Sequence, residues 1–354
     1  MCSVIGIRHD DRGLMGGSYD FHYHHGLIVS NRRGLHKQAL EQNQPVLEWE
    51  SRYGSVTLDQ FGRELPSCGI NEAGLAIHMA QQPGKNYPPV PEGQPKLTEL
   101  QWIQYQLDRH GDVDEVIAAL DEAPIAPAYT ELHYALCDSN GDMAIIEYVA
   151  GERRVIRNPH SHGLVMTNHS VSEELNSRDR SGQVDAPRDS TRRFEELWQQ
   201  LDGLAKGMMS ERSLQSGLPD DAGLNHLAHS LELVRRRFSY WTLMKWLLLR
   251  IPPFYTCWNT LFDCAGKRLF VRGLRRASWH QVSVSKLDLA PNAPALGMDL
   301  ERMIDADLTR KLKPLRREDN ARIIRASYRP LGKLISEQEI EALIDYPDLF
   351  QSHT

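Results

Sequence analysis

Cys2, the second residue of the chain, is the side chain whose type and position most directly suggest chemistry. If the initiator Met1 is removed, Cys2 carries a thiol and a free α-amine on the same carbon. An α-amine has a pKa of about 7.7–8.0, which suits a general base at neutral pH. Because an N-terminal amine can activate a nucleophile, Cys2 is a candidate catalytic residue. The alternative is an ordinary thiol at a position that varies freely.

Two other residues could complete a site around Cys2. A thiol that attacks an amide needs a group that orients the amine and a donor for the tetrahedral oxyanion. Asp20, on a strand expected to return beside the N-terminal one, could orient the amine, and Asn168 could supply an amide donor. Each also has a plainer interpretation: Asp20 as a polar residue at a strand end, and Asn168 as a loop residue that caps its own backbone.

A pair of histidines offers a different hypothesis. Strand alternation places His22 and His24 on one face, where two imidazoles could share a metal ion, with Asp20 as a third ligand. The alternative is a polar strand near the surface, and the sequence contains no His-Glu-x-x-His motif. We therefore expect neither a metal ion nor a cofactor.

Composition narrows the class of protein. The chain has 354 residues, of which 41% are hydrophobic and 25% charged, with a net charge of −6. This mild acidity argues against nucleic acid as a partner. Five scattered cysteines without a CxxC pair fit neither a disulfide framework nor a zinc site, and we expect a cytoplasmic protein without a signal peptide. The most apolar stretch, 241–251, is too short for a membrane span, so we expect a buried helix there and no membrane partner.

The elements that must position these side chains alternate between strands and helices. A turn signal at 10–13 separates strands at 3–8 and 14–21, and the clearest strand pattern is a meander at 132–137, 143–149 and 155–157. Further strands are expected at 26–32, 54–58, 69–75, 255–262, 269–272 and 279–287, helices at 97–107, 113–120, 194–201 and 224–238, and loops at 83–95 and 177–189. Asp112 and either Asp189 or Ser190 are expected as N-terminal caps.

This order of elements predicts an α+β fold in which two sheets are layered between helices. No segment before about Pro294 has the composition of a linker between domains. Residues 1–297 are therefore expected to form one domain, and residues 298–354 a polar, helical C-terminal extension.

Several short motifs follow one another in an order that resembles a known family. The motifs are Cys2, 16–21 (Gly-Gly-Ser-Tyr-Asp-Phe), Arg33-Gly34, 71–75 (Asn-Glu-Ala-Gly-Leu), Leu132-His133 with Asp138 and Gly141, Glu147-Tyr148, Thr167-Asn168 and Arg193-Phe194. Their combination over about residues 2–290 is similar to that of the choloylglycine hydrolases and penicillin V acylases. These are cysteine N-terminal-nucleophile (Ntn) hydrolases that cleave linear amides.

The resemblance implies a four-layer αββα sandwich and an amidase that acts on a non-peptide amide bond of a small N-acyl compound through an acyl-thioester. Cys2 would be the nucleophile and, through its α-amine, the base. Asp20 would hold the amine and thiol, and Asn168 would form part of the oxyanion hole. Arg193, or Arg192 if the register differs by one, would be a buried cation near the nucleophile. Relatives often assemble as homotetramers.

Two further positions follow from the resemblance. Gln81 falls where family members place Asn or Tyr, and it could still donate an amide N–H to the substrate or oxyanion. Gly17 stands where relatives usually carry Arg, so the guanidinium of that position is missing. Two alternatives stay open: an acyltransferase related to isopenicillin N acyltransferase, and a non-catalytic binding protein that has kept the fold.

Overall fold

The computed structural model describes most of the chain. The described residues are 2–40, 45–84, 86–180, 186–208, 215–237, 244, 247–248, 254–329 and 335–352.

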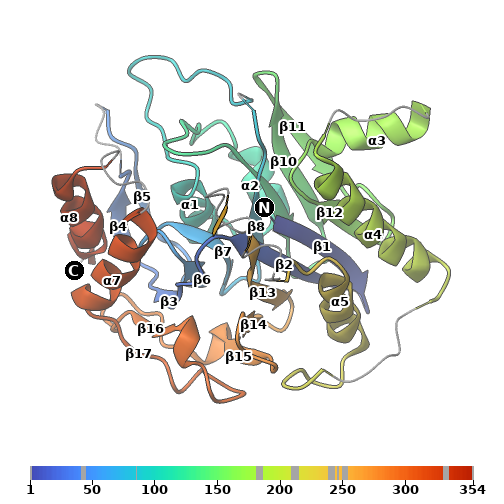
Figure 1. Ribbon diagram of the computed structural model, residues 1–354. Coiled ribbons are helices and arrows are strands. Elements are labelled where there is room, and N and C mark those ends of the chain that lie inside the picture. The colour runs from blue at the N-terminus through green and yellow to red at the C-terminus, as the bar shows by residue number, and fades with distance from the viewer. Residues whose placement is uncertain are drawn as a thin grey trace.

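The first sheet holds the N-terminal strand in an interior position. Its strands are antiparallel and follow the order β12-β1-β2-β13-β14-β15. Their bounds are β1 (Cys2–His9), β2 (Arg12–Phe21), β12 (Gly163–Met166), β13 (Tyr255–Asp263), β14 (Arg268–Gly273) and β15 (His280–Ser283). The N-terminus, from which β1 starts, lies near the centre of the view in Figure 1, between elements of both large sheets.

The second sheet lies against the first and is larger. Its antiparallel strands follow the order β11-β10-β9-β8-β7-β6-β3-β16-β17. Their bounds are β3 (Leu27–Asn31), β6 (Ser55–Asp59), β7 (Pro66–Asn71), β8 (Ala76–Gln81), β9 (Leu132–Cys137), β10 (Met143–Val149), β11 (Glu152–Arg157), β16 (Leu296–Asp299) and β17 (Lys313–Pro314). A small third sheet joins β4 (Leu35–Gln38), β5 (Glu48–Glu50) and β18 (Gln351–Ser352).

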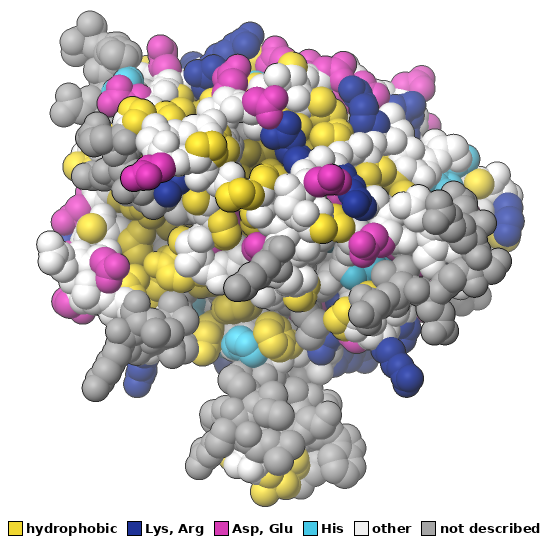
Figure 2. All heavy atoms as spheres, turned by 90° about the horizontal axis from the view of Figure 1, so that it is seen from above, with side chains coloured by type: hydrophobic (Ala, Val, Ile, Leu, Met, Phe, Trp, Pro, Cys, Tyr) yellow, Lys and Arg dark blue, Asp and Glu magenta, His cyan; other side chains and the backbone are white. Residues whose placement is uncertain are grey.

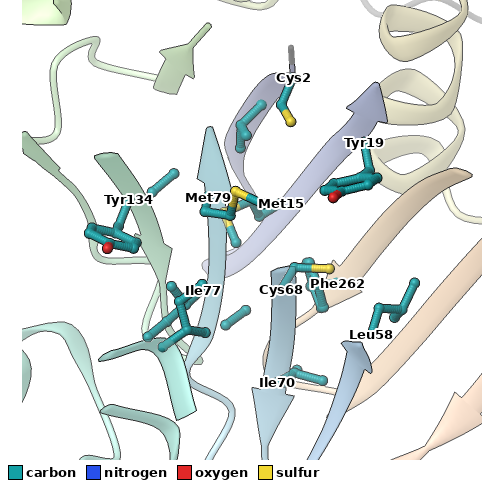
Figure 3. Close-up of a cluster of buried hydrophobic side chains, with 14 of the residues drawn as sticks. Cys2, Met15, Tyr19, Leu58, Cys68, Ile70, Ile77, Met79, Tyr134 and Phe262 are labelled. Carbon is teal, nitrogen blue, oxygen red and sulfur yellow. The ribbon is translucent and has the colours of Figure 1, made fainter. Parts of the chain in front are cut away.

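Helices cover the outer faces of both large sheets. α4 and α5 pack on the first sheet and α1 packs on the second (Figure 1). The helices are α1 (Gln101–Arg109), α2 (Val113–Ala118), α3 (Val171–Arg180), α4 (Arg188–Ala205), α5 (Ala222–Leu233), α7 (Arg317–Tyr328) and α8 (Glu337–Asp345). The core lies where the sheets face each other, and it includes Met15 and Tyr19 from one sheet and Leu58, Cys68, Ile77 and Met79 from the other (Figure 3). The predicted αββα sandwich is confirmed.

Local sequence signals explain the first hairpin. Asp10 and Asp11 form a two-residue turn in which both have positive φ, 49° and 57°. Asp and Asn tolerate this conformation better than most residues, and a two-residue turn of this hand matches the twist of the strands that it joins. The turn sets the register that places Cys2 opposite Tyr19.

The helix boundaries differ in part from the predicted ones. The cap at Asp112 is confirmed, because its side chain accepts a hydrogen bond from the backbone N–H of Glu115. The predicted cap of α4 is wrong: the helix begins at Arg188, and Asp189 and Ser190 lie in its first turn. The loop predicted at 177–189 is wrong at its start, because α3 continues to Arg180. Asp189 and Ser190 use their side chains elsewhere, as the site shows.

The stretch 241–251, predicted as a buried helix, lies mostly outside the described residues. Met244, Leu247 and Leu248 are described and helical. Leu247 and Leu248 are 49% and 72% exposed, so these two side chains are not buried as predicted. Within the described ranges, no helix combines the length and the apolar character that crossing a membrane requires.

The C-terminal part continues the second sheet. β16 spans the expected division between residues 297 and 298 and pairs with β3, and β17 pairs with β16. α7 and α8 then pack on each other. The division into a domain of residues 1–297 and an extension of residues 298–354 stays a prediction.

A buried carboxyl in the second sheet makes stability depend on pH. Asp59 is fully buried, and burial raises the pKa of its carboxyl to about 8, although Thr57 and the backbone of Glu64 oppose the shift. An unfolded Asp titrates near 3.9. Between these pH values the folded state holds a proton that the unfolded state has lost, so the free energy of unfolding falls as the pH rises toward 8.

Asp59→Asn is expected to remove this dependence, because the amide does not ionise. The free energy of unfolding of the variant relative to the parent should rise by about 1–3 kcal/mol between about pH 5 and about pH 8, measured by urea unfolding. Asp11→Asn, at an exposed turn position, is the matched control and should show no such trend. A difference between Asp59→Asn and the parent that is the same at both pH values contradicts the assignment.

Candidate active site

Cys2 lies at the first position of β1, next to the space between the two sheets. It is opposite Tyr19 on β2, and both side chains belong to the cluster shown in Figure 3. The Cys2 residue is 3% exposed and borders a cavity of about 660 Å³. The thiol is therefore buried within the protein but faces a space that could hold a small molecule.

A buried arginine holds the backbone of Cys2. Nη1 of Arg193 donates to the carbonyl oxygen of Cys2 at 2.6 Å and to Ser3 Oγ at 2.5 Å. Nη2 of Arg193 donates to Oδ1 of Asn168 at 2.9 Å, and the same oxygen accepts the backbone N–H of Cys2 at 2.9 Å. Nε of Arg193 pairs with Asp189, one turn earlier on α4, at 3.0 Å. These bonds give a fully buried cation the acceptors that it needs.

The structure places Arg193, and not Arg192, beside Cys2. The side chain of Arg192 is 58% exposed and lies 3.7 Å from Asp189. Arg193 shares its helix face with Phe194, Leu197 and Leu201, which are buried against the first sheet. The face of α4 therefore decides between the two arginines that the sequence left open.

The pairing of β12 with β1 and a contact from α4 together place Asn168 beside Cys2. β12 pairs with β1 so that Met166 lies opposite Val4, and two residues later Asn168 comes level with Cys2. Ser190 Oγ accepts the backbone N–H of Asn168 at 2.8 Å. Ser190 was, with Asp189, one of two expected caps of α4, but its hydroxyl instead fixes the segment that carries Asn168.

Gln81 lies at the same junction. Nδ2 of Asn168 donates to the backbone carbonyl of Gln81 at 2.7 Å. The side-chain amide of Gln81 donates to Thr130 Oγ1 at 2.9 Å, and both residues line the cavity. The structure thus places Gln81 in the cavity wall and Asn168 between Gln81 and the nitrogen of Cys2, while their roles toward an oxyanion stay a prediction.

Asp20 is buried on β2 and bonded to β13. Thr256 Oγ1 donates to Asp20 Oδ1 at 2.7 Å. The pairing of β13 with β2 shifts register between Thr256 and Trp258, which leaves Cys257 as an extra residue in β13. Such a bulge changes the direction of neighbouring side chains. The bulge coincides with the residue that bonds Asp20.

The electrostatic environment keeps the thiol protonated at rest. Burial raises the pKa of the Cys2 thiol above its ordinary value, while the charge of the amino terminus opposes the shift. Burial also raises the pKa of Asp20, and the amino terminus, the bond from Thr256 and Arg193 lower it. A neutral thiol is a weak nucleophile, so chemistry at Cys2 requires a base that removes its proton.

His78 occupies the space that a side chain at position 17 would need. A Cβ on Gly17 would lie 2.3 Å from both Cδ2 and Nε2 of the His78 ring. His78 is fully buried, Nδ1 lies 2.9 Å from the carbonyl oxygen of Met79, and burial lowers the pKa of the imidazole to about 4. A neutral ring therefore stands beside the position at which the resemblance predicts an arginine.

Arg236 is a residue of this site that the sequence reasoning missed. Nη1 of Arg236 donates to Asp189 at 2.5 Å, and its backbone N–H donates to Thr256 Oγ1 at 2.9 Å. Its charge, like that of Arg193, lowers the pKa of Asp20. The available signal was a run of three arginines, 235–237, directly after the apolar helix α5.

The two histidines of the metal hypothesis lie in different surroundings, and only His22 lines the cavity beside Cys2. His22 packs on the ring of Phe254, with 3.8 Å between centroids. His24 bonds Glu301 at 2.8 Å and the Tyr255 hydroxyl at 3.1 Å. Among the residues whose positions are described, no group of three His, Cys, Asp or Glu side chains could hold a metal ion.

The cavity beside Cys2 is mainly apolar, with rings over much of its wall. Hydrophobic side chains gather around a hollow in the face seen in Figure 2. The lining includes Phe21, Tyr23, Phe61, Met79, Leu100, Tyr129, Leu132 and Tyr328. The buried carboxylate of Glu99 also borders it but accepts backbone N–H groups of Ala128, Tyr129 and Thr130, at 2.7, 3.0 and 3.2 Å. Glu99 thereby shapes the wall, and an apolar group fits the space.

Comparison with known proteins gives a family and a set of similar folds. Residues 8–216 match the profile of the family described as acyl-coenzyme A:6-aminopenicillanic acid acyl-transferase. A penicillin V acylase of Pectobacterium atrosepticum is 35% identical over an alignment of 154 residues, with coverages of 39% of this chain and 41% of that enzyme. The alignment therefore spans less than half of the length of that relative.

Solved structures extend the likeness over most of the fold. Penicillin V acylase from Agrobacterium tumefaciens superposes with a TM-score of 0.68 at 21% identity, covering 89% of this chain and 98% of that one. A mutant of conjugated bile acid hydrolase from Clostridium perfringens gives a TM-score of 0.66 at 15% identity, covering 87% and 98%. At these identities the likeness concerns the fold.

Arg193→Gln is expected to lower the free energy of unfolding by about 3 kcal/mol, because it leaves buried acceptors without a charged donor. Urea unfolding measures the loss. Arg192→Gln removes an exposed arginine of the same helix and should change stability by less than about 0.5 kcal/mol. Equal losses in the two variants would show that the buried contacts contribute nothing particular.

Proposed function

This chain belongs to the acyl-coenzyme A:6-aminopenicillanic acid acyl-transferase family, and from that premise we propose that it hydrolyses a linear, non-peptide amide bond of an N-acyl compound. The observation that carries the proposal is the position of Cys2, whose thiol borders an apolar cavity while its nitrogen is held by Asn168. The motif order that resembles penicillin V acylases and choloylglycine hydrolases agrees with the family.

The first step is the release of the base. Removal of Met1 converts the nitrogen of Cys2 from a peptide N–H into an α-amine at the same place, beside Oδ1 of Asn168 at 2.9 Å. The amine takes the proton of the thiol, and the sulfur attacks the substrate carbonyl carbon. A C–S bond forms, and the carbonyl oxygen gains negative charge. This supplies the base that the neutral, buried thiol lacks.

The second step releases the amine, and the third releases the acid. The tetrahedral intermediate collapses with cleavage of the C–N bond, and the protonated α-amine gives its proton to the leaving nitrogen. Water then attacks the acyl-thioester and gives a proton to the α-amine. Cleavage of the C–S bond frees the carboxylic acid, and the sulfur recovers its proton.

The neighbouring residues hold this arrangement. We assign Asn168 and Gln81 to the oxyanion and substrate carbonyl, because Gln81 lines the cavity and Asn168 bonds both its backbone carbonyl and the nitrogen of Cys2. Asp20 is assigned to balance the charge that forms on the α-amine, because it lines the same cavity as Cys2 and, together with burial, its charge raises the pKa of the Cys2 thiol. Arg193 fixes the Cys2 carbonyl and Asn168 together and keeps the attacking sulfur in register.

The substrate is proposed to carry an apolar acyl group. The cavity beside Cys2 is walled mainly by rings and aliphatic side chains, so burial of apolar surface contributes the binding energy. Two of the similar enzymes are named for penicillin V and for conjugated bile acids, and these compounds are suitable first probes. We also propose a cytoplasmic location and a homotetramer, and analytical ultracentrifugation tests the latter.

Acyl transfer is the second candidate function, and the description of the matched family favours it. In that reaction an amine replaces water in the attack on the thioester. Product analysis with and without an added amine separates the two. A new amide that grows with amine concentration at the expense of free acid would identify a transferase.

The proposal predicts an acyl adduct on Cys2. The purified protein should lack Met1 by intact mass, and brief incubation with penicillin V should add the mass of the acyl group to the N-terminal peptide. Cys2→Ala should form no adduct and lose activity by about 10⁴-fold. Cys264→Ala, which removes a buried thiol that does not line the cavity, is the control. Retention of Met1 with no adduct across acyl classes would instead favour a non-catalytic binding protein.

A further inference from the structure

The end of α7 reaches the cavity that Cys2 borders. α7 belongs to the part of the chain that the sequence presents as an appendage, yet its last two residues, Ser327 and Tyr328, line the cavity. Both are buried, with exposures of 3% and 2%. A C-terminal helix thus supplies part of the wall beside an N-terminal nucleophile.

Hydrogen bonds connect this helix end to the strand opposite Cys2. Ser327 Oγ donates to the backbone carbonyl of Gln60 at 2.8 Å. The side chain of Gln60 accepts the Tyr19 hydroxyl at 2.6 Å, and Tyr19 is the partner of Cys2 across β1 and β2. Gln60 also donates to the carbonyl oxygens of Tyr23 and His25, at 2.8 and 3.0 Å. Hydrogen bonds through Gln60 therefore connect the end of α7 to Tyr19, the residue opposite Cys2.

A run of aromatic contacts follows the same direction. Tyr19 contacts Phe21, Phe21 contacts Phe61, and Phe61 contacts Tyr328, each with 5.8 Å between ring centroids. Tyr328 then meets Tyr129 at 5.7 Å, edge to face. Tyr129 is 59% exposed, whereas Tyr328 is buried. Tyr328 consequently stands between the inner rings and the exposed rim of the cavity.

Other residues hold α7 in place without Tyr328. Asn320 accepts the backbone N–H of Arg63 and donates to the carbonyl oxygen of Ile344, both at 2.9 Å. Arg322 pairs with Asp299 at 2.6 Å. Because these contacts dock the helix independently, the ring of Tyr328 can be varied while the helix stays seated.

We propose that α7 is a specificity element of the active site and that Tyr328 limits the size of the acyl group that the cavity accepts. The inference rests on the proposed function for the identity of the ligand as an acyl group. The ring closes the apolar space between Phe61 and Tyr129, so its removal lengthens the cavity in that direction. The hydrogen bond from Ser327 to the backbone carbonyl of Gln60 fixes the position of the neighbouring Tyr328.

Three variants test this. Tyr328→Ala removes the ring, and Tyr328→Phe keeps it. Ile324→Ala truncates a side chain buried one turn earlier on α7 against Gly62, and it controls for general loosening of the helix. Straight-chain N-acyl amides of one amine, from short to long acyl groups, serve as substrates. The corresponding free carboxylic acids serve as ligands for calorimetry, which needs no turnover.

Tyr328→Ala should move the preferred chain length upward and raise kcat/KM and affinity for the longest chains by about tenfold, since one methylene in an apolar pocket is worth at least that factor. Tyr328→Phe and Ile324→Ala should keep the parent profile. If Tyr328→Ala lowers kcat/KM by the same factor for every chain length, or if none of the acids binds to the protein, the inference is wrong. If the acids bind and Tyr328→Ala moves the preferred chain length upward, but no amide is turned over, the inference is supported and the proposed hydrolysis is wrong.

Discussion

A buried guanidinium must have acceptors for its N–H groups, because an unpaired charge in the interior costs several kcal/mol. For Arg193 these acceptors come from three places: the start of β1, the segment after β12, and the first turn of α4. Satisfying one cation therefore fixes the position of the chain's first strand relative to a helix that lies far from it in the sequence. The same bonds hold both sides of Cys2, its nitrogen through Asn168 and its carbonyl directly.

Much of the framework could be predicted because its signals are local. The β1–β2 hairpin follows from alternation and two turn-forming aspartates, and the β9–β10–β11 meander follows from the same kind of pattern. Asp20 was placed beside Cys2 because adjacent strands of a hairpin must pair. The choice between Arg192 and Arg193 was also within reach, since Arg193 and Leu197 are four residues apart on one apolar face.

The remaining features depend on contacts that no local pattern contains. The local sequence suggests Ser190 as a helix cap. In the structure its hydroxyl accepts the backbone N–H of Asn168, and α4 begins earlier than expected. Arg236 gains its role only when β13 brings Thr256 to Asp20. The polar composition of the C-terminal residues gives no sign that β16 pairs with β3 in the second sheet. Such competition between distant partners decides structure where local preference is weak.

The close approach of His78 to Gly17 also constrains how this sequence can change. A side chain cannot be introduced at position 17 while the imidazole remains, because the ring atoms lie 2.3 Å from where its first carbon would stand. Conversely, a smaller residue at position 78 would leave a cavity unless position 17 grew. The residues at the two positions therefore constrain each other, and an arginine at position 17 requires a replacement at position 78 as well. Homologues should accordingly divide into lineages with paired states, rather than mixing the residues of the two positions freely.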